Sequence, residues 1–155
     1  MRPDRQLLAD SIKVQIDAMA PSHAITLAFN RTVPAGQAAR TLRHLGALLD
    51  RELLGSRWQN KPDLRTTGLF VPEHMDSNSH YHGVLHVHPV YREKFERLLA
   101  ASIDPLTGEE IRILPLWRFI YAPGSSCVKA YSSSGWGSYM TKDLTEKTLD
   151  QVVTL

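Results

Sequence analysis

The sequence contains very little cysteine, because Cys127 is the only one among its 155 residues. No internal disulfide can form, and a reducing compartment is expected. No apolar run approaches the length of a membrane span, and the stretch from Met1 to Gln6 does not resemble a secretory signal. These absences predict a cytoplasmic protein with no membrane partner.

The composition is that of an ordinary globular domain, with 43% hydrophobic and 22% charged residues. A chain of this length forms one domain with a sizeable core, so residues 1–155 are interpreted as a single domain. The formal net charge is +2 at neutral pH. This mildly basic balance is compatible with a nucleic-acid partner but is too weak to imply one.

Histidine is concentrated in one short stretch, where four of the seven histidines lie within residues 80–88. In a strand, successive side chains point to opposite faces. One face would therefore carry imidazoles and the other apolar groups, with His80, His82, His86 and His88 on the first and Tyr81, Leu85 and Val87 on the second. Two histidines at i and i+2 can reach one divalent metal ion. A single His-x-His pair is also common as a plain structural feature, so further ligands are needed.

Glu73 is the candidate for the third ligand. It ends a predicted strand, residues 66–73, which pairs with the histidine strand across the turn at residues 74–79. Simple alternation from Leu69 and Val71 would place Glu73 on the helix-packed face, so a bulge at Pro72 would have to redirect it. The alternative is a solvated carboxylate in a turn, and His74 is the fallback ligand.

The remaining pattern predicts an α+β fold. Helices are expected at residues 5–19, from 34 to about 55, from 89 onward and from 136 to 143. Strands are expected at residues 23–30 and 111–121, with a short strand or loop at 127–131 and a helix or frayed tail at 145–155. The order predicts an antiparallel sheet of four to five strands with helices on one face, the split βαβ plan.

Three short motifs then coincide with one known family. Ala24–Phe29 looks like a hydrophobic-Thr-Leu strand, His80–Leu85 looks like two histidines around a bulky residue, and Tyr139–Lys142 is a Tyr-x-x-Lys. In this order and spacing, over residues 24–142, the chain resembles the HUH-type single-strand nucleases, which include the rolling-circle replication initiators of plasmids and phages. Glu73 stands where that family commonly has its extra carboxylate.

The resemblance implies a ferredoxin- or RRM-like HUH fold and a role for each motif. His80, His82 and Glu73 would bind Mg or Mn, and Tyr139 would attack single-stranded DNA to form a 5′-phosphotyrosine intermediate, assisted by Lys142. Tyr121 and Tyr131 are alternative nucleophiles without the Tyr-x-x-Lys context. The implied function is rolling-circle replication initiation. A transposase of the same superfamily, a non-catalytic nucleic-acid-binding domain and a hydrolase that uses water remain alternatives.

The expected partner is single-stranded DNA, as an origin hairpin or a nick site. The candidate DNA contacts are polar, basic or aromatic residues in loops and on the outer face: Thr26, Asn30, Arg31, Trp58 and Arg65. Trp58 fits equally well as a core tryptophan. His86 and His88 lie outside the motif and are expected to be structural or to touch DNA. The chain has no phosphate loop, so a host helicase or a substrate that is already single-stranded is required.

Overall fold

The computed structural model describes residues 3–132 and 135–155. Its helices are α1 (Pro3–Met19), α2 (Ala35–Leu54), α3 (Arg92–Arg97), α4 (Pro115–Ile120), α5 (Gly135–Met140) and α6 (Glu146–Leu149). Its strands are β1 (His23–Ala28), β2 (Thr67–Glu73), β3 (His80–His86), β4 (Ala100–Ile103), β5 (Glu110–Ile113), β6 (Ser125–Ala130) and β7 (Val153–Thr154). The fold is therefore α+β, as the sequence predicts.

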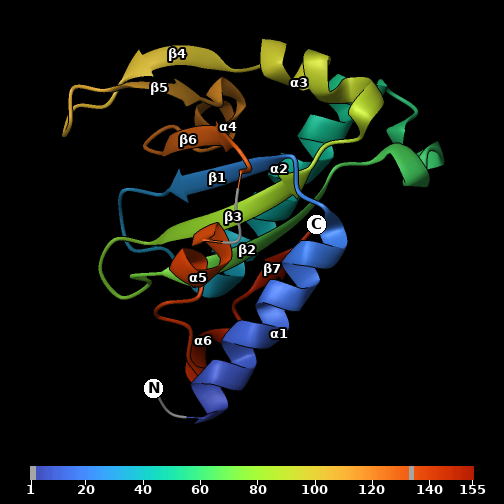
Figure 1. Cartoon of the computed structure of the whole chain (residues 1–155). Helices are drawn as coiled ribbons and strands as arrows, with labels where there is room; N and C mark the ends of the chain where they lie inside the picture. The colour runs from blue at the N-terminus through green and yellow to red at the C-terminus, as the bar shows by residue number, and fades with distance from the viewer. Residues whose placement is uncertain (1–2, 133–134) are drawn as a thin grey trace.

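The strands form one antiparallel sheet in the order β4-β5-β6-β1-β3-β2-β7. Its middle, β6-β1-β3-β2, contains the predicted split βαβ unit: β1 and β2 both pair antiparallel with β3, and α2 connects them (Figure 1). Within the described residues the sheet has seven strands, so the expected four to five were too few. The β4–β5 hairpin extends one edge, and β7 extends the other.

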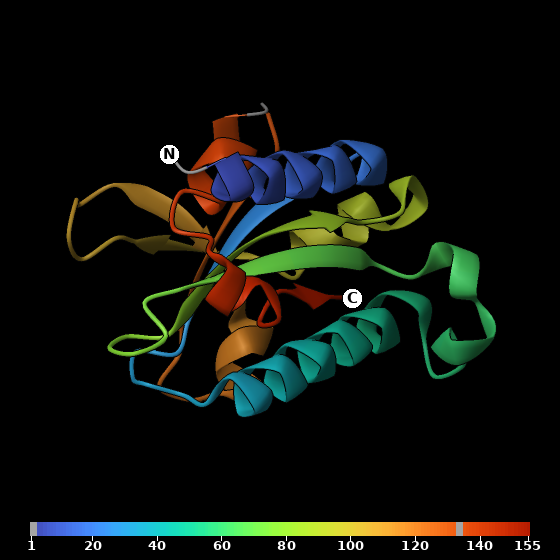
Figure 2. The same cartoon turned by 90° about the horizontal axis from the view of Figure 1, so that it is seen from below.

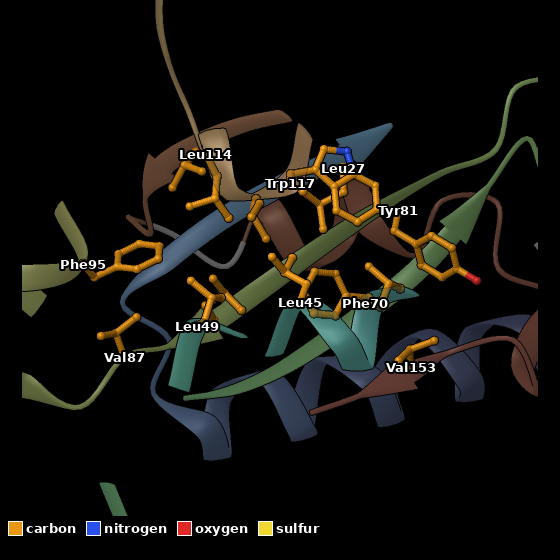
Figure 3. Close-up of a cluster of buried hydrophobic side chains, with 14 of the residues drawn as sticks. Leu27, Leu45, Leu49, Phe70, Tyr81, Val87, Phe95, Leu114, Trp117 and Val153 are labelled. Carbon is orange, nitrogen blue, oxygen red and sulfur yellow. The ribbon is translucent and has the colours of Figure 1, made fainter. Parts of the chain in front are cut away.

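The main core lies between the sheet and α2. Helix α2 places a leucine stripe against the sheet because its apolar residues recur every three or four positions. Tyr81, Leu85 and Val87 belong to this core, as the alternation in the histidine stretch predicts. Figure 3 shows Leu45 and Leu49 of α2 facing Phe70, Tyr81 and Trp117.

The second face of the sheet is also covered, so the expectation of helices on one face was wrong. Figure 2 shows α1 on the side of the sheet opposite to α2. A smaller apolar cluster forms there between Ile12 and Ile16 of α1, Met140 of α5, and strand residues that include Leu69, Val71 and Val84. Helix α1 buries these residues because Ile12 and Ile16 lie one turn apart on one side of the helix.

Residues 111–121 are the largest local departure from the sequence prediction. They were expected to be one strand, but β5 ends at Ile113 and α4 begins at Pro115, where a proline suits the first turn of a helix. These apolar residues therefore lie in a helix, with Trp117 fully buried.

The two segments whose structure the sequence left open are also resolved. Residues 125–130 form a strand, and the tail at 145–155 divides into α6 and β7. None of the described helices is both long and apolar enough to cross a membrane.

Gly83 gives a test of how β3 packs. A Cβ at this position would overlap the Phe70 ring, which lies over the glycine from β2. We expect Gly83→Ala to lower the free energy of unfolding by about 1–3 kcal/mol, because the ring must move within a packed core. Urea denaturation measures the change. The exposed Gly36 in the first turn of α2 provides the matched control, since a Cβ there meets only the end of the Arg40 side chain and Gly36→Ala should not lower the stability. Equal stability of the Gly83→Ala variant and the wild type would contradict this packing.

Candidate metal and tyrosine site

The β2–β3 hairpin brings Glu73 and two histidines to one end of the sheet. The register pairs Glu73 with His80 and Val71 with His82 without interruption. The predicted bulge at Pro72 is therefore absent. It is unnecessary because Leu69 and Val71 face the α1 side, which is the same face that carries Glu73, His80 and His82. Pro72 lies beyond the stretch of β2 that pairs with β7, where its missing N–H leaves no gap in that ladder.

The Glu73 carboxylate is the centre of this site, and its side chain is only 7% exposed. Its Oε2 lies 3.0 Å from His80 Nε2 and also contacts His82 Nε2. Its Oε1 lies 3.1 Å from Lys142 Nζ and 3.2 Å from His74 Nε2. One carboxylate is thus shared by three imidazoles and one ammonium group, which come from the turn after β2, from β3 and from the segment after α5.

The environment of His80 fixes the role of its ring nitrogens. Nδ1 lies 3.0 Å from the carbonyl oxygen of Asn78, which can only accept, so Nδ1 carries a hydrogen. Nε2 then faces a carboxylate oxygen at 3.0 Å. A neutral ring would place a lone pair against that oxygen, so the pair requires a proton or another cation between the two groups.

His82 is oriented by a second residue. Its Nδ1 lies 3.0 Å from Thr26 Oγ1 on the neighbouring strand β1, while its Nε2 contacts Glu73. Thr26 is paired directly with His82 in the β1–β3 register. A hydroxyl can accept from or donate to the ring, so Thr26 can support His82 either as a hydrogen-bond donor to Glu73 or as a metal ligand.

Two residues of this cluster, Glu73 and His82, have lowered pKa values. In Glu73 the neighbouring groups act against burial, whereas in His82 burial itself causes the shift. Burial by itself would raise the pKa of Glu73, but hydrogen bonds and charges from Lys142, His82 and His80 outweigh it and lower the pKa to about 2. Burial lowers the pKa of His82, although Glu73 opposes that shift. The carboxylate is therefore ionised and His82 favours its neutral form, which is the form that binds metal.

Helix α5 places Tyr139 beside the cluster. The Tyr139 and His82 rings have their centroids 4.9 Å apart, and Lys142 Nζ lies 4.2 Å from the centre of the tyrosine ring. Trp136, one turn earlier, stacks on Tyr139 and donates from Nε1 to the Gly83 carbonyl oxygen at 2.9 Å. The tyrosine remains 45% exposed. It is thus held by its neighbours and open to a partner in solution.

The donor set fits a divalent cation. Ligand atoms of Glu73, His74 and His80 all lie within 4.8 Å of one another. Neighbouring ligands on an ion with bonds of about 2.1 Å are separated by about 3 Å, which matches the distance between Glu73 Oε2 and His80 Nε2. Imidazole and carboxylate ligands suit Mn, Zn and related ions. Among the described residues this group therefore contains the fallback ligand His74 with Glu73 and His80, but not the predicted ligand His82. The His74 backbone has a φ of 52°, in the left-handed region.

The candidate DNA contacts are divided between two places. Thr26 belongs to the site, and Asn30 and Arg31 follow β1 at the same end of the sheet, where Asn30 holds the Pro123 carbonyl oxygen. Trp58 and Arg65 precede β2 at its other end, about 20 Å away along the strand. There Arg65 stacks over Trp58 and pairs with the buried Asp50 of α2. The structure does not bring these two residues to Tyr139.

The other histidines of the 80–88 stretch make local contacts. His86 Nδ1 lies 2.8 Å from the Ala20 carbonyl oxygen, and His88 accepts from the Val90 backbone N–H.

The sequence did not point to two residues near Tyr139. These are Cys127 and Lys129 of β6, which line a cavity with the tyrosine. Only the pairing of Thr26 with Cys127 across β1 and β6 would have revealed them, and strand pairing between distant segments leaves no local signal.

Comparison of the chain with protein-family models, with curated proteins and with solved structures finds no match in any of the three.

The cluster makes a direct prediction about metal binding. Removing a ligand in His80→Ala should abolish tight Mn²⁺ binding, and Thr26→Val should weaken it by about 10–100-fold, because the support of His82 is lost. Isothermal titration with Mn²⁺ measures both. His44 is exposed on α2, away from the sheet, so His44→Ala is the matched control and should bind as the wild type does. Unchanged Mn²⁺ affinity in His80→Ala would exclude the site.

A second prediction concerns acid stability of the metal-free protein. The pKa of Glu73 lies near 2 in the folded state and near 4.5 ordinarily, so its ionised form stabilises the fold above about pH 5. That stabilisation, at most about 3 kcal/mol, should be lost as the pH falls from about 5 toward 2. The difference in free energy of unfolding between wild type and Glu73→Gln, measured with EDTA present, should shrink over this window. A difference that stays constant from neutral pH to pH 3 would contradict the assignment.

Proposed function

We propose that this protein is a metal-dependent endonuclease and strand transferase that acts on single-stranded DNA through Tyr139. The observation that carries the proposal is the meeting of Tyr139 with the Glu73–His80–His82 cluster. The tyrosine comes from α5, far along the chain from the β2–β3 hairpin, yet its ring centroid lies 4.9 Å from that of His82. An exposed phenol, a cation-binding cluster and an ammonium group together are what phosphodiester transfer to a tyrosine requires.

The reaction would be a transesterification. The Tyr139 hydroxyl oxygen attacks the phosphorus, and the bond from phosphorus to the 3′ oxygen breaks. The DNA 5′ end becomes a phosphotyrosine, and the phenol proton is transferred overall to the departing 3′ oxygen. Attack by another 3′-hydroxyl reverses the step and joins strands, without ATP, because the phosphodiester energy is kept in the covalent bond.

The side chains around Tyr139 have separate tasks. Glu73, His80, His82 and His74 would hold a divalent cation, Mg or Mn, whose chemistry is to neutralise charge on the phosphate oxygens. Lys142 supports the phenol, because its ammonium group lies over the Tyr139 ring and is fixed by Glu73. Thr26 orients His82, and Trp136 limits the movement of the tyrosine by stacking on it.

This chemistry supports a role in initiating rolling-circle replication of a plasmid or phage, with single-stranded DNA at an origin hairpin or nick site as the partner and a host helicase for unwinding. A transposase would use the same step on different DNA. The proposal extends the resemblance of the three motifs to HUH nucleases, and the convergence of those motifs in space supports it.

The test is the formation of a covalent protein–DNA adduct. Wild-type protein, Mn²⁺ and a pool of labelled single-stranded oligonucleotides should give labelled protein that survives denaturing electrophoresis. Tyr139→Phe should lose at least about 10³-fold of the adduct, because removing the nucleophile leaves no covalent route. The controls are the other two candidate nucleophiles, and Tyr121→Phe and Tyr131→Phe should both keep the adduct.

Other outcomes would point to the alternatives. Cleavage without a labelled protein, retained in Tyr139→Phe, would indicate a hydrolase that uses water. Binding that survives EDTA, with no cleavage of any oligonucleotide, would indicate a non-catalytic DNA-binding domain. Either result would overturn the proposed function.

A further inference from the structure

A cavity of about 270 Å³ lies directly beside Tyr139, on the sheet face opposite to α2. Strands β1 and β6 form its floor, where Thr26 and Cys127 are paired neighbours in the register. Helix α5 forms its wall with the stacked rings of Trp136 and Tyr139. His82 lies between floor and wall, so the cavity and the candidate metal site share a boundary.

The wall of this cavity is held in place by several contacts. The Trp136 indole is held from three sides: it donates to the Gly83 carbonyl oxygen, stacks on Tyr139, and meets the edge of the His82 ring with centroids 5.5 Å apart. Gly137 behind it is buried against Lys13 and Ile16 of α1. An aromatic wall held in this way is suited to stack a flat ring, and stacking of bases on aromatic side chains is tolerant of sequence.

The described residues that line the cavity include one lysine, Lys129, and no carboxylate. Lys129 is exposed at its rim, and its charge opposes the burial that raises the pKa of Cys127. A second hollow of about 450 Å³ also touches Cys127 and Lys129, but it runs over β5, where the Glu109 and Glu110 carboxylates lie beside Arg112, which is paired with Glu96. The first cavity, which has no carboxylate among its described lining residues, is therefore the more favourable path for a polyanion, and its volume is just below the usual range of ligand pockets.

We infer that this cavity binds one nucleobase, that of a nucleotide next to the phosphodiester that Tyr139 attacks, with Lys129 near its phosphate. The inference rests on the proposed function and adds a binding site to it. A base seated against Trp136 holds the adjoining phosphate beside Tyr139 and His82. The cavity thus positions the reacting bond, and its shape contributes to the choice of the cleaved sequence.

The sole cysteine of the chain provides a direct readout, because Cys127 lines the cavity. The Tyr139→Phe variant is incubated in EDTA with single-stranded oligonucleotides, which it binds without cutting, and iodoacetamide labelling of Cys127 is followed by intact-protein mass. We expect bound oligonucleotides to slow labelling at least tenfold. Oligomers of the same length with abasic sites throughout should slow it less than twofold at equal occupancy, measured by fluorescence anisotropy.

A pair of tryptophan variants tests the site. Cys127→Trp fills the cavity and should weaken oligonucleotide binding at least tenfold while Mn²⁺ affinity stays unchanged, and Ala101→Trp at an exposed position of β4 outside the cavity should leave both unchanged. Equal labelling rates with and without bound oligonucleotide, or equal protection by abasic oligomers, would overturn the base site while the phosphotyrosine adduct could still form. Absence of both oligonucleotide binding and adduct would overturn the proposed function together with this site.

Discussion

The buried Glu73 carboxylate is the constraint on which the rest of the site depends. A carboxylate that is 7% exposed is costly unless positive or donor groups surround it. Here His80 and His82 approach one oxygen, and His74 and Lys142 approach the other. The regular β2–β3 register supplies the two strand histidines, and the turn after Glu73 supplies His74. The imidazole nitrogens among these groups are atoms that a divalent cation could use together with the carboxylate, so one arrangement could serve both the stability of the free protein and the binding of metal.

The carboxylate also connects two parts of the chain that are far apart in sequence. Lys142 follows α5, and its ion pair with Glu73 ties the helix that carries Tyr139 to the end of β2. Packing of Met140 against α1 and the sheet holds the other side of α5. The covering of the second sheet face by α1 is therefore part of the site, because it supports the helix that presents the tyrosine.

Local patterns in the sequence predicted the strand histidines correctly, since alternation alone places His80 and His82 opposite Tyr81 and Leu85. Glu73 was expected to reach the histidines through a bulge at Pro72, and that bulge is absent. The expectation assumed that Leu69 and Val71 face the α2 core. A strand that is apolar on both faces does not reveal which side each residue faces, and only the packing of α1 resolves it. Residues 111–121 show a similar limit: a short apolar run fits a strand or a buried helix, and Pro115 favoured the helix. The cavity between β1, β6 and α5 depends on long-range pairing and could not be predicted.

We propose that Tyr139 forms a covalent bond to DNA at the Glu73 cluster, and peptide mapping can detect that bond. Protein treated with Mn²⁺ and single-stranded oligonucleotides is digested with a nuclease and then with a protease, and the peptides are analysed by tandem mass spectrometry. We expect a nucleotide joined through its 5′ phosphate to Tyr139, present with Mn²⁺ and absent with EDTA. A nucleotide on Tyr121 or Tyr131, or an adduct on Tyr139 that forms equally well in EDTA, would contradict it.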